Sequence, residues 1–264
     1  MKVIAVVNQK GGVGKTVSTV NIAVGLARKG KRVLAIDLDP QGSLTVSFGE
    51  KDPDSIPITV NNILENIMKD IEFDVSYAVM EHKEGIQFVP SNLQLAGVDM
   101  QLMNSISRES ILKEYTKRIA ERYDYIVIDC SPSLGLLTVN ALACADEVVI
   151  PVQAQYLSMK GMEQLLDSIK KIKKKINMKL EIAGILITMV DNRTTCAKEL
   201  IQAIRRIYDR KINVFQSTIP MSVKVTEMSI SGESIFEYDP QGKVAQCYES
   251  VVAELLLHFD GGEQ

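Results

Sequence analysis

Several residue types are scarce in this sequence, and each scarcity argues against a class of protein. The 264 residues contain no tryptophan, two histidines and four cysteines. The cysteines lack both a CxxC pair and a metal-binding grouping, so we expect reduced thiols in a cytoplasmic protein. They are Cys130, Cys144, Cys196 and Cys247. With only His82 and His258 available, histidine-dependent nucleophilic or metal chemistry is poorly supported.

Long apolar runs are also missing. None reaches the roughly 18 residues that a membrane helix requires. The N-terminus enters a strand-like run at Val3–Val7 without a signal-peptide h-region and cleavage site, so no signal peptide is expected.

The overall charge of −3 is unevenly distributed. Residues 170–224 hold 13 Lys and Arg against four acidic residues, a net charge of +9, so the rest of the chain carries −12. One basic region on an acidic protein is a candidate surface for a polyanion, although exposed helix faces would give the same composition.

Strand-like apolar runs alternate with helical patterns along the chain. The alternation predicts one doubly wound α/β domain over residues 1–264, with a largely parallel sheet flanked by helices. The Pro- and Asp-rich residues 49–62 are predicted as a loop. The predicted strands are 3–7, 33–37, 86–90, 125–129, 147–151, 183–189 and 214–220. The predicted helices are 16–29, 92–103, 107–122, 134–144, 157–176, 195–209 and 243–259.

The strongest chemical signal is the glycine-rich segment Lys10–Thr16, KGGVGKT, between a predicted strand and a predicted helix. Glycines let backbone N–H groups wrap around phosphates, and the helix adds its positive N-terminal end. In such a phosphate-binding loop, or P-loop, Lys15 would reach the β- and γ-phosphates and the Thr16 hydroxyl would bind Mg²⁺. Gln9 occupies the first glycine position of the standard pattern.

Two further strands end in carboxylates. Tyr125–Asp129 has the Walker B form, which places Asp129 near Mg²⁺. The segment Asp37–Gly42 (DLDPQG) follows the second strand. Beside a nucleotide site, its acids are interpreted as a switch that senses the γ-phosphate, although two acids in a turn also favour ordinary turn structure.

These motifs together resemble the ParA/MinD group of deviant Walker A ATPases, specifically its short, Soj-like chromosomal branch. The resemblance runs nearly end to end. It rests on KGGVGKT at 10–16, DLDPQGS at 37–43, YIVIDCSPSLG at 125–135, ITMVDNRT at 187–194 and IPMSVKVTEMS at 219–229.

The resemblance implies an ATPase that uses ATP and Mg²⁺ and closes into a nucleotide-sandwich homodimer. Asp39 matches the acid that positions the attacking water, and Asp129 matches the Walker B acid, which makes both candidate metal-site residues beside Thr16. Lys10 matches the signature lysine that crosses to the partner's phosphates, and Lys10, Lys15, Asp39 and Asp129 form the candidate catalytic set. The implied nucleotide-binding residues are Lys10, Gly11, Gly12, Val13, Gly14, Lys15, Thr16 and Val17, with Pro220 and Ser222 beside adenine.

The resemblance also implies non-specific DNA binding in the ATP state and a nucleoid-associated location in the cytoplasm. Arg193 and Lys224 match DNA-contacting positions, and both lie in the +9 region. Hydrolysis would be stimulated by a ParB-type centromere-binding partner. Val17 replaces the family's second threonine and Met221 replaces an arginine, and both changes are expected to weaken contacts.

Two other functions share the motifs. A MinD-like membrane ATPase would need a basic amphipathic C-terminal helix. No Lys or Arg follows Lys243, and the apolar stripe of the C-terminal helix is typical of core packing, so no membrane partner is expected. A slowly hydrolysing, ATP-dependent regulatory DNA switch remains the other alternative.

Overall fold

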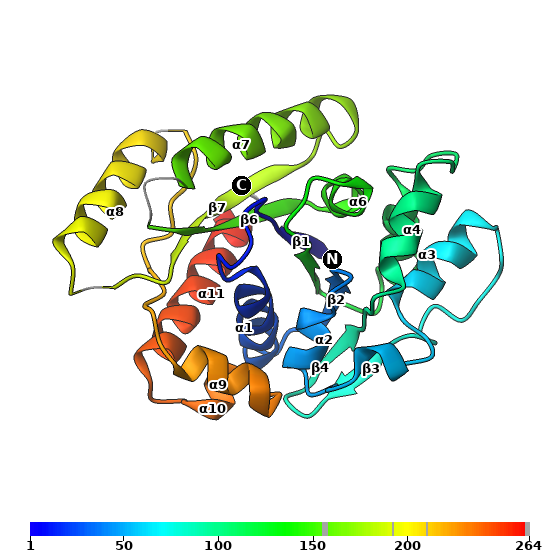
Figure 1. Ribbon diagram of the computed structural model, residues 1–264, viewed down its shortest axis with the longest axis horizontal. Coiled ribbons are helices and arrows are strands. Elements are labelled where there is room, and N and C mark those ends of the chain that lie inside the picture. Colours follow the sequence, from blue (N-terminus) through cyan, green and yellow to red (C-terminus); the bar gives the residue numbers. More distant parts are fainter. Residues whose placement is uncertain (155–157, 192, 210, 262–264) are drawn as a thin grey trace.

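The computed structural model describes residues 1–154, 158–191, 193–209 and 211–261, and its centre is a seven-stranded sheet (Figure 1). The spatial strand order is β3-β4-β2-β5-β1-β6-β7. Every pair of neighbours is parallel except β3 and β4. The strands are β1 (Lys2–Val6), β2 (Val33–Leu38), β3 (Met80–His82), β4 (Ile86–Val89), β5 (Tyr125–Cys130), β6 (Glu147–Gln153) and β7 (Glu181–Thr188).

Helices cover both faces of this sheet. One apolar core joins the sheet to α3 (Val60–Met68), α4 (Leu95–Leu102), α5 (Ile111–Arg118), α6 (Leu136–Cys144), α7 (Ser158–Lys175) and α8 (Thr195–Tyr208). The core on the opposite face joins it to α1 (Lys15–Arg28), α2 (Ser43–Ser47), α9 (Lys224–Ser231), α10 (Ile235–Tyr238) and α11 (Lys243–Gly261). The predicted doubly wound α/β fold is therefore confirmed.

The central strands are apolar because both of their faces are buried. Every residue of β2 and β5 is buried, including Asp37 and Asp129, which lie side by side in the parallel register. Parallel strands covered by helices need continuous apolar sequence rather than alternation. A carboxylate within such a strand is unusual and needs polar partners to offset its burial.

The predicted strand at 214–220 is wrong. This segment forms only isolated bridges, Ile185 with Val214 and Val190 with Pro220. The Glu254 side chain accepts the backbone N–H groups of Gln216 and Ser217, at 2.7 and 3.1 Å. Glu254 therefore takes two of the hydrogen bonds that a continuous ladder would use, while Phe215 and Ile219 still donate backbone bonds to β7.

The predicted loop at 49–62 is also partly wrong. A 3₁₀ turn covers Pro53–Ser55, and α3 begins at Val60. The Asn62 side chain accepts the backbone N–H of Thr59 at 2.8 Å, which stabilises a helix start that the polar sequence conceals. The short elements α2, β3, α9 and α10 had no counterpart among the predicted elements.

The C-terminal helix packs as the sequence predicted. Val251, Val252, Leu255 and Phe259 of α11 are buried in the core. No helix in the described part of the chain is both long and apolar enough to cross a membrane. The three cysteines whose side chains are described are free and buried, namely Cys130, Cys144 and Cys247.

Candidate nucleotide site

The P-loop connects the C-terminal end of β1 to the N-terminus of α1. Gly12 and Gly14 have φ values of 70° and 84°, in the left-handed region that other residues rarely adopt. Gly14 is also the N-cap of α1, and no side chain caps that helix end. The N–H groups of the first turn are therefore available to an anion, as a phosphate site requires.

Hydrogen bonds fix the outer side of this loop. The Asn8 side chain donates to the carbonyl of Pro151 at 2.7 Å and accepts from the backbone N–H of Lys10 at 3.0 Å. Thr188 Oγ1, at the end of β7, donates to the carbonyl of Val13 at 2.8 Å. Gln153 Nε2, at the end of β6, donates to the carbonyl of Gly12 at 2.9 Å.

Lys15 is buried at the base of the loop. Its Nζ donates to the carbonyl of Lys10 at 3.2 Å. Burial lowers the pKa of Lys15, while the negative charges of Asp129 and Asp39 act in the opposite direction. An ammonium held in this position is suited to bind the terminal phosphates of a nucleotide.

Thr16 and Asp129 meet as the sequence predicted for a magnesium site. Thr16 Oγ1 donates to Asp129 Oδ2 at 2.7 Å, and Thr19 Oγ1 lies 3.2 Å from Asp129 Oδ1. Hydroxyl and carboxylate oxygens are suitable ligands for Mg²⁺, directly or through water. The described residues contain no cluster of three or more Asp, Glu, His or Cys that could hold a metal. Mg²⁺ normally keeps several waters and binds substrate phosphates, so one hydroxyl and one carboxylate are sufficient ligands from the protein.

Burial raises the pKa of Asp129 and of its neighbour Asp37. Desolvation and the nearby charge of Asp37 raise the pKa of Asp129 to about 8. Burial raises the pKa of Asp37 to about 6, although hydrogen bonds from Thr45 oppose this change. A divalent cation beside Asp129 would favour its ionised form.

These pKa values predict a pH-dependent stability in the nucleotide-free protein. Both carboxyls have a higher pKa in the folded protein than in the unfolded chain. Their contribution to the free energy of unfolding is therefore fully present at acidic pH, below the pKa of the unfolded chain. It is lost as the pH rises through the pKa values of Asp37, about 6, and Asp129, about 8.

Urea denaturation between pH 6 and pH 9 measures this effect. We expect the free energy of unfolding to fall by roughly 3 kcal/mol more in the wild type than in Asp129→Asn over this range. Equal pH dependence in the two proteins would contradict a protonated Asp129.

Asp39 lies beyond β2, in the loop that leads to α2. Its carboxylate accepts from the backbone N–H of Gln41 at 3.0 Å, and its carbonyl accepts from Ser91 Oγ at 2.9 Å. The buried Asp37 accepts from the backbone N–H and hydroxyl of Thr45 at 2.9 and 2.7 Å, so it anchors α2. The two acids of DLDPQG therefore differ: one fixes the segment, and the other remains near the site entrance.

A small pocket of about 90 Å³ adjoins the P-loop. The predicted adenine-side residues Pro220 and Ser222 line it, together with Gly14, Val17 and residues of β7 and α11. Its position beside the N-terminus of α1 suits a base attached to phosphates bound at that helix. Sequence reasoning had not connected Thr188 and Tyr248 with this pocket, although both line it.

The two predicted DNA-binding residues lie on adjoining segments, with Arg193 in the loop after β7 and Lys224 at the start of α9. The backbone N–H groups of Val190 and Met221 donate to the carbonyls of Ile219 and Val190, both at 3.0 Å, which joins the loop after β7 to the segment before α9. The Arg193 side chain is 89% exposed and forms a forked ion pair with Asp191. Lys224 Nζ lies 3.4 Å from Glu227 and 5.3 Å from the ring centre of Tyr238.

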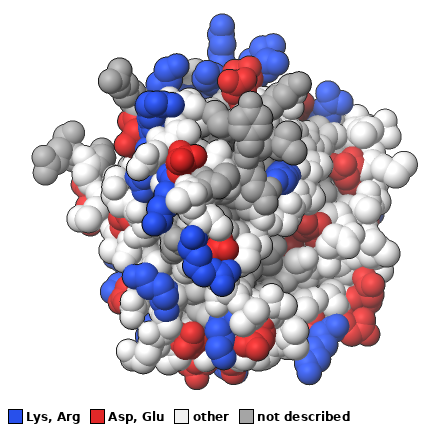
Figure 2. Space-filling model, turned by 60° about the vertical axis from the view of Figure 1, so that its left-hand side comes forward, with Lys and Arg blue, Asp and Glu red and all other residues white. Residues whose placement is uncertain are grey.

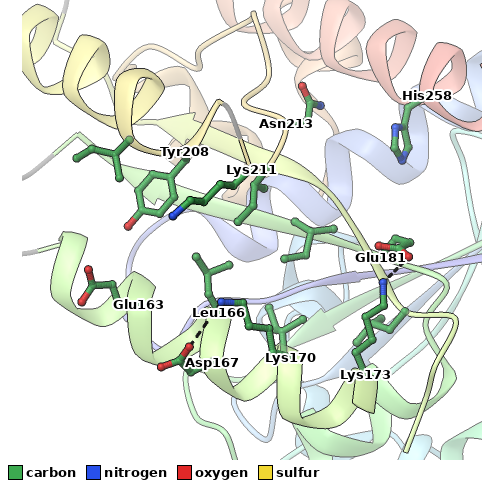
Figure 3. A pocket seen from close by; sticks show the side chains of 15 residues that line it. Glu163, Leu166, Asp167, Lys170, Lys173, Glu181, Tyr208, Lys211, Asn213 and His258 are labelled. Atoms are coloured by element: carbon green, nitrogen blue, oxygen red, sulfur yellow. Dashed lines mark hydrogen bonds and ion pairs between the residues drawn. The ribbon is translucent and has the colours of Figure 1, made fainter.

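A second, larger pocket lies elsewhere. It measures about 650 Å³ and is bounded by α7, α8, the start of β7 and His258 (Figure 3). Parallel strands place this end of β7 opposite the end that faces the P-loop. Lys173 pairs with Glu181 and Lys170 pairs with Asp167, so these charges at the rim are compensated.

The geometry therefore defines a P-loop nucleotide site with candidate magnesium ligands. A family described as an AAA domain matches residues 1–182. The sporulation initiation inhibitor protein Soj of Bacillus subtilis is 39% identical over 97% of this chain and 99% of its own length. The chromosome partitioning protein ParA of Myxococcus xanthus is 37% identical over 97% of this chain and 88% of its own length.

Solved structures with the same fold contain adenine nucleotides. A Mycobacterium smegmatis protein named cobyrinic acid a,c-diamide synthase, with bound ADP and magnesium, is 34% identical. Its TM-score is 0.86, with 99% of this chain and 96% of that chain covered. A putative plasmid partition protein of Borrelia burgdorferi B31, bound to AMPPNP, is 27% identical with a TM-score of 0.77, covering 97% and 98%.

These names differ, but the proteins share the nucleotide-binding fold. This chain belongs to the ParA/Soj family of P-loop ATPases. The family expected from the sequence motifs is therefore confirmed.

Proposed function

We propose that residues 1–264 act as one ATP-gated partitioning domain, which binds DNA without sequence preference in its ATP state and releases it after hydrolysis. The observation that carries the proposal is that one short segment, 220–224, both lines the pocket beside the P-loop and carries Lys224. Pro220 and Ser222 line the pocket beside Gly14, and the segment ends at Lys224, the first residue of α9. A nucleotide in that pocket would therefore contact the same segment that carries Lys224, the lysine proposed to bind DNA.

The chemistry assigns separate roles to the site residues. Lys15 and the N-terminus of α1 bind the phosphates, and Thr16 with Asp129 would hold Mg²⁺, which neutralises charge on the phosphates when bound. Asp39 orients the attacking water. Lys10 reaches the phosphates of a second copy, where its charge offsets the repulsion between two triphosphates in a sandwich homodimer.

Surface charge supports the DNA proposal. Lys and Arg side chains spread over the face formed near α7, α8 and α9, with acidic side chains among them (Figure 2). Two copies of such a surface would contact more phosphates than one, and each contact adds sequence-independent, salt-sensitive affinity. DNA binding would thereby depend on dimer formation and place the protein on the nucleoid.

Loss of phosphate would relax the segments at 37–43 and 129–135, which begin at the ends of β2 and β5, and free the dimer from DNA. A ParB-type centromere-binding protein is the proposed stimulator of hydrolysis. This partner fits the relatives named for chromosome partitioning.

The Arg193→Ala variant tests the proposed DNA contact. Removal of one phosphate contact from each subunit is expected to weaken binding to random duplex DNA by about tenfold or more, since each charged hydrogen bond contributes on the order of 1.5 kcal/mol. Binding should be measured by fluorescence anisotropy with a slowly hydrolysed ATP analogue at two salt concentrations.

Arg32→Ala is the matched control. Arg32 is also exposed and forms a forked pair with Asp124, but it lies at the start of β2, away from the nucleotide end of the sheet. Its removal should leave DNA affinity unchanged. Equal DNA affinity in wild type and Arg193→Ala would remove Arg193 from the interface.

A further inference from the structure

Gln153, the last residue of β6, connects three parts of the nucleotide site. Its Nε2 donates to the carbonyl of Gly12 at 2.9 Å and contacts Met189 Sδ just beyond β7. Its Oε1 accepts from Lys10 Nζ at 3.5 Å. Both ends of one neutral amide are therefore used, one toward the P-loop and one toward the signature lysine.

The hydrogen bond from Gln153 restrains the orientation of the Gly12 carbonyl. Gly12 is in the left-handed region, and a Cβ placed on it would meet nothing within 4 Å. The hydrogen bond from Gln153 is therefore one of the contacts that orient the Gly12 carbonyl. A carbonyl held on the outer side leaves neighbouring N–H groups directed inward, where phosphate oxygens bind.

The contact with Lys10 needs an acceptor of moderate strength. A carboxylate at this position would form an ion pair that Lys10 would have to break before reaching a partner's phosphate. The amide oxygen of Gln153 is neutral, so it orients the ammonium at a smaller cost on release. A glutamine at position 153 therefore suits a contact that Lys10 leaves when a dimer forms.

We propose that Gln153 is a positioning residue for this ATPase. It fixes the Gly12 peptide for phosphate binding and holds Lys10 at the edge of the site before a dimer forms. The second statement rests on the proposed role of Lys10, whereas the first needs only nucleotide binding.

The first statement is tested by MgADP affinity, which requires neither dimer nor DNA. Gln153→Met keeps the side-chain length and removes both hydrogen bonds, so the dissociation constant should rise by about fivefold. Thr188→Val, which removes the corresponding bond to Val13, should act similarly. Gln164→Met, on the exposed side of α7, is the control and should match wild type. Unchanged affinity in a folded Gln153→Met protein would overturn this statement.

The second statement is tested by the reactivity of the Lys10 amine in nucleotide-free protein. Acetylation followed by mass spectrometry should show Lys10 reacting about threefold faster in Gln153→Met, because a hydrogen bond to the ammonium is lost. In Gln153→Glu the new ion pair should slow the same reaction. The exposed Lys31 provides an internal control.

A purely structural role for Gln153 would not shift Lys10 reactivity in opposite directions in these two variants. Equal Lys10 reactivity in all three proteins would overturn the second statement. Because neither assay uses DNA, a failure here is distinguishable from a failure of the proposed partitioning function.

Discussion

Asp39→Ala is expected to lower the ATP hydrolysis rate by about 100-fold, as does the loss of a residue that orients an attacking water. Nucleotide binding should persist, because Lys15, Thr16 and Asp129 form the base of the site without Asp39. The ATP-bound protein should therefore accumulate and stay on DNA. Phosphate release and DNA binding should be measured on the same preparation.

Asp52→Ala is a suitable control for this experiment. Asp52 is an exposed acid in the loop after α2, and its change should leave hydrolysis unaltered. Normal turnover in Asp39→Ala would contradict the role assigned to Asp39. Slow turnover combined with lost DNA binding would instead show that Asp39 is needed to form the ATP state.

Lys15→Ala should have the second large effect, on nucleotide binding itself. Lys15 is 7% exposed and held against the P-loop carbonyl of Lys10, so its ammonium is already placed for phosphate. Loss of its charged hydrogen bonds should weaken ATP and ADP binding by about 100-fold.

Isothermal titration with each nucleotide measures this loss, and thermal unfolding without nucleotide shows whether the variant still folds. Lys31→Ala removes an exposed lysine after α1 and should bind nucleotide normally. Retention of wild-type affinity by folded Lys15→Ala would contradict the phosphate-binding role of the loop.

Much of the fold could be predicted because its central strands are buried on both sides. Such strands must be continuous and apolar, and β1, β2, β5 and β6 are visible in the sequence for that reason. The segment at 214–220 has the same apolar character at its ends. Two of its backbone N–H groups bond instead to Glu254 in α11, a long-range contact that a local pattern does not reveal.

The candidate site was predictable where it consists of a continuous motif. Lys10–Thr16 indicated the loop, and a carboxylate at the end of an apolar strand indicated Asp129. Thr188 and Gln153 could not be recognised in this way, because each contacts the P-loop through a hydrogen bond to a backbone carbonyl that is distant in the sequence. A sequence could indicate such residues only by a polar side chain at the end of a strand that neighbours the P-loop strand.

Nucleotide-dependent binding to random duplex DNA tests the central claim most directly. Binding should be measured without nucleotide and with ADP, ATP and a slowly hydrolysed analogue, each at two salt concentrations. The account predicts binding only in the triphosphate states, weakened at the higher salt concentration. Equal binding in all four states, or no DNA binding despite ATP-dependent dimerisation, would contradict it.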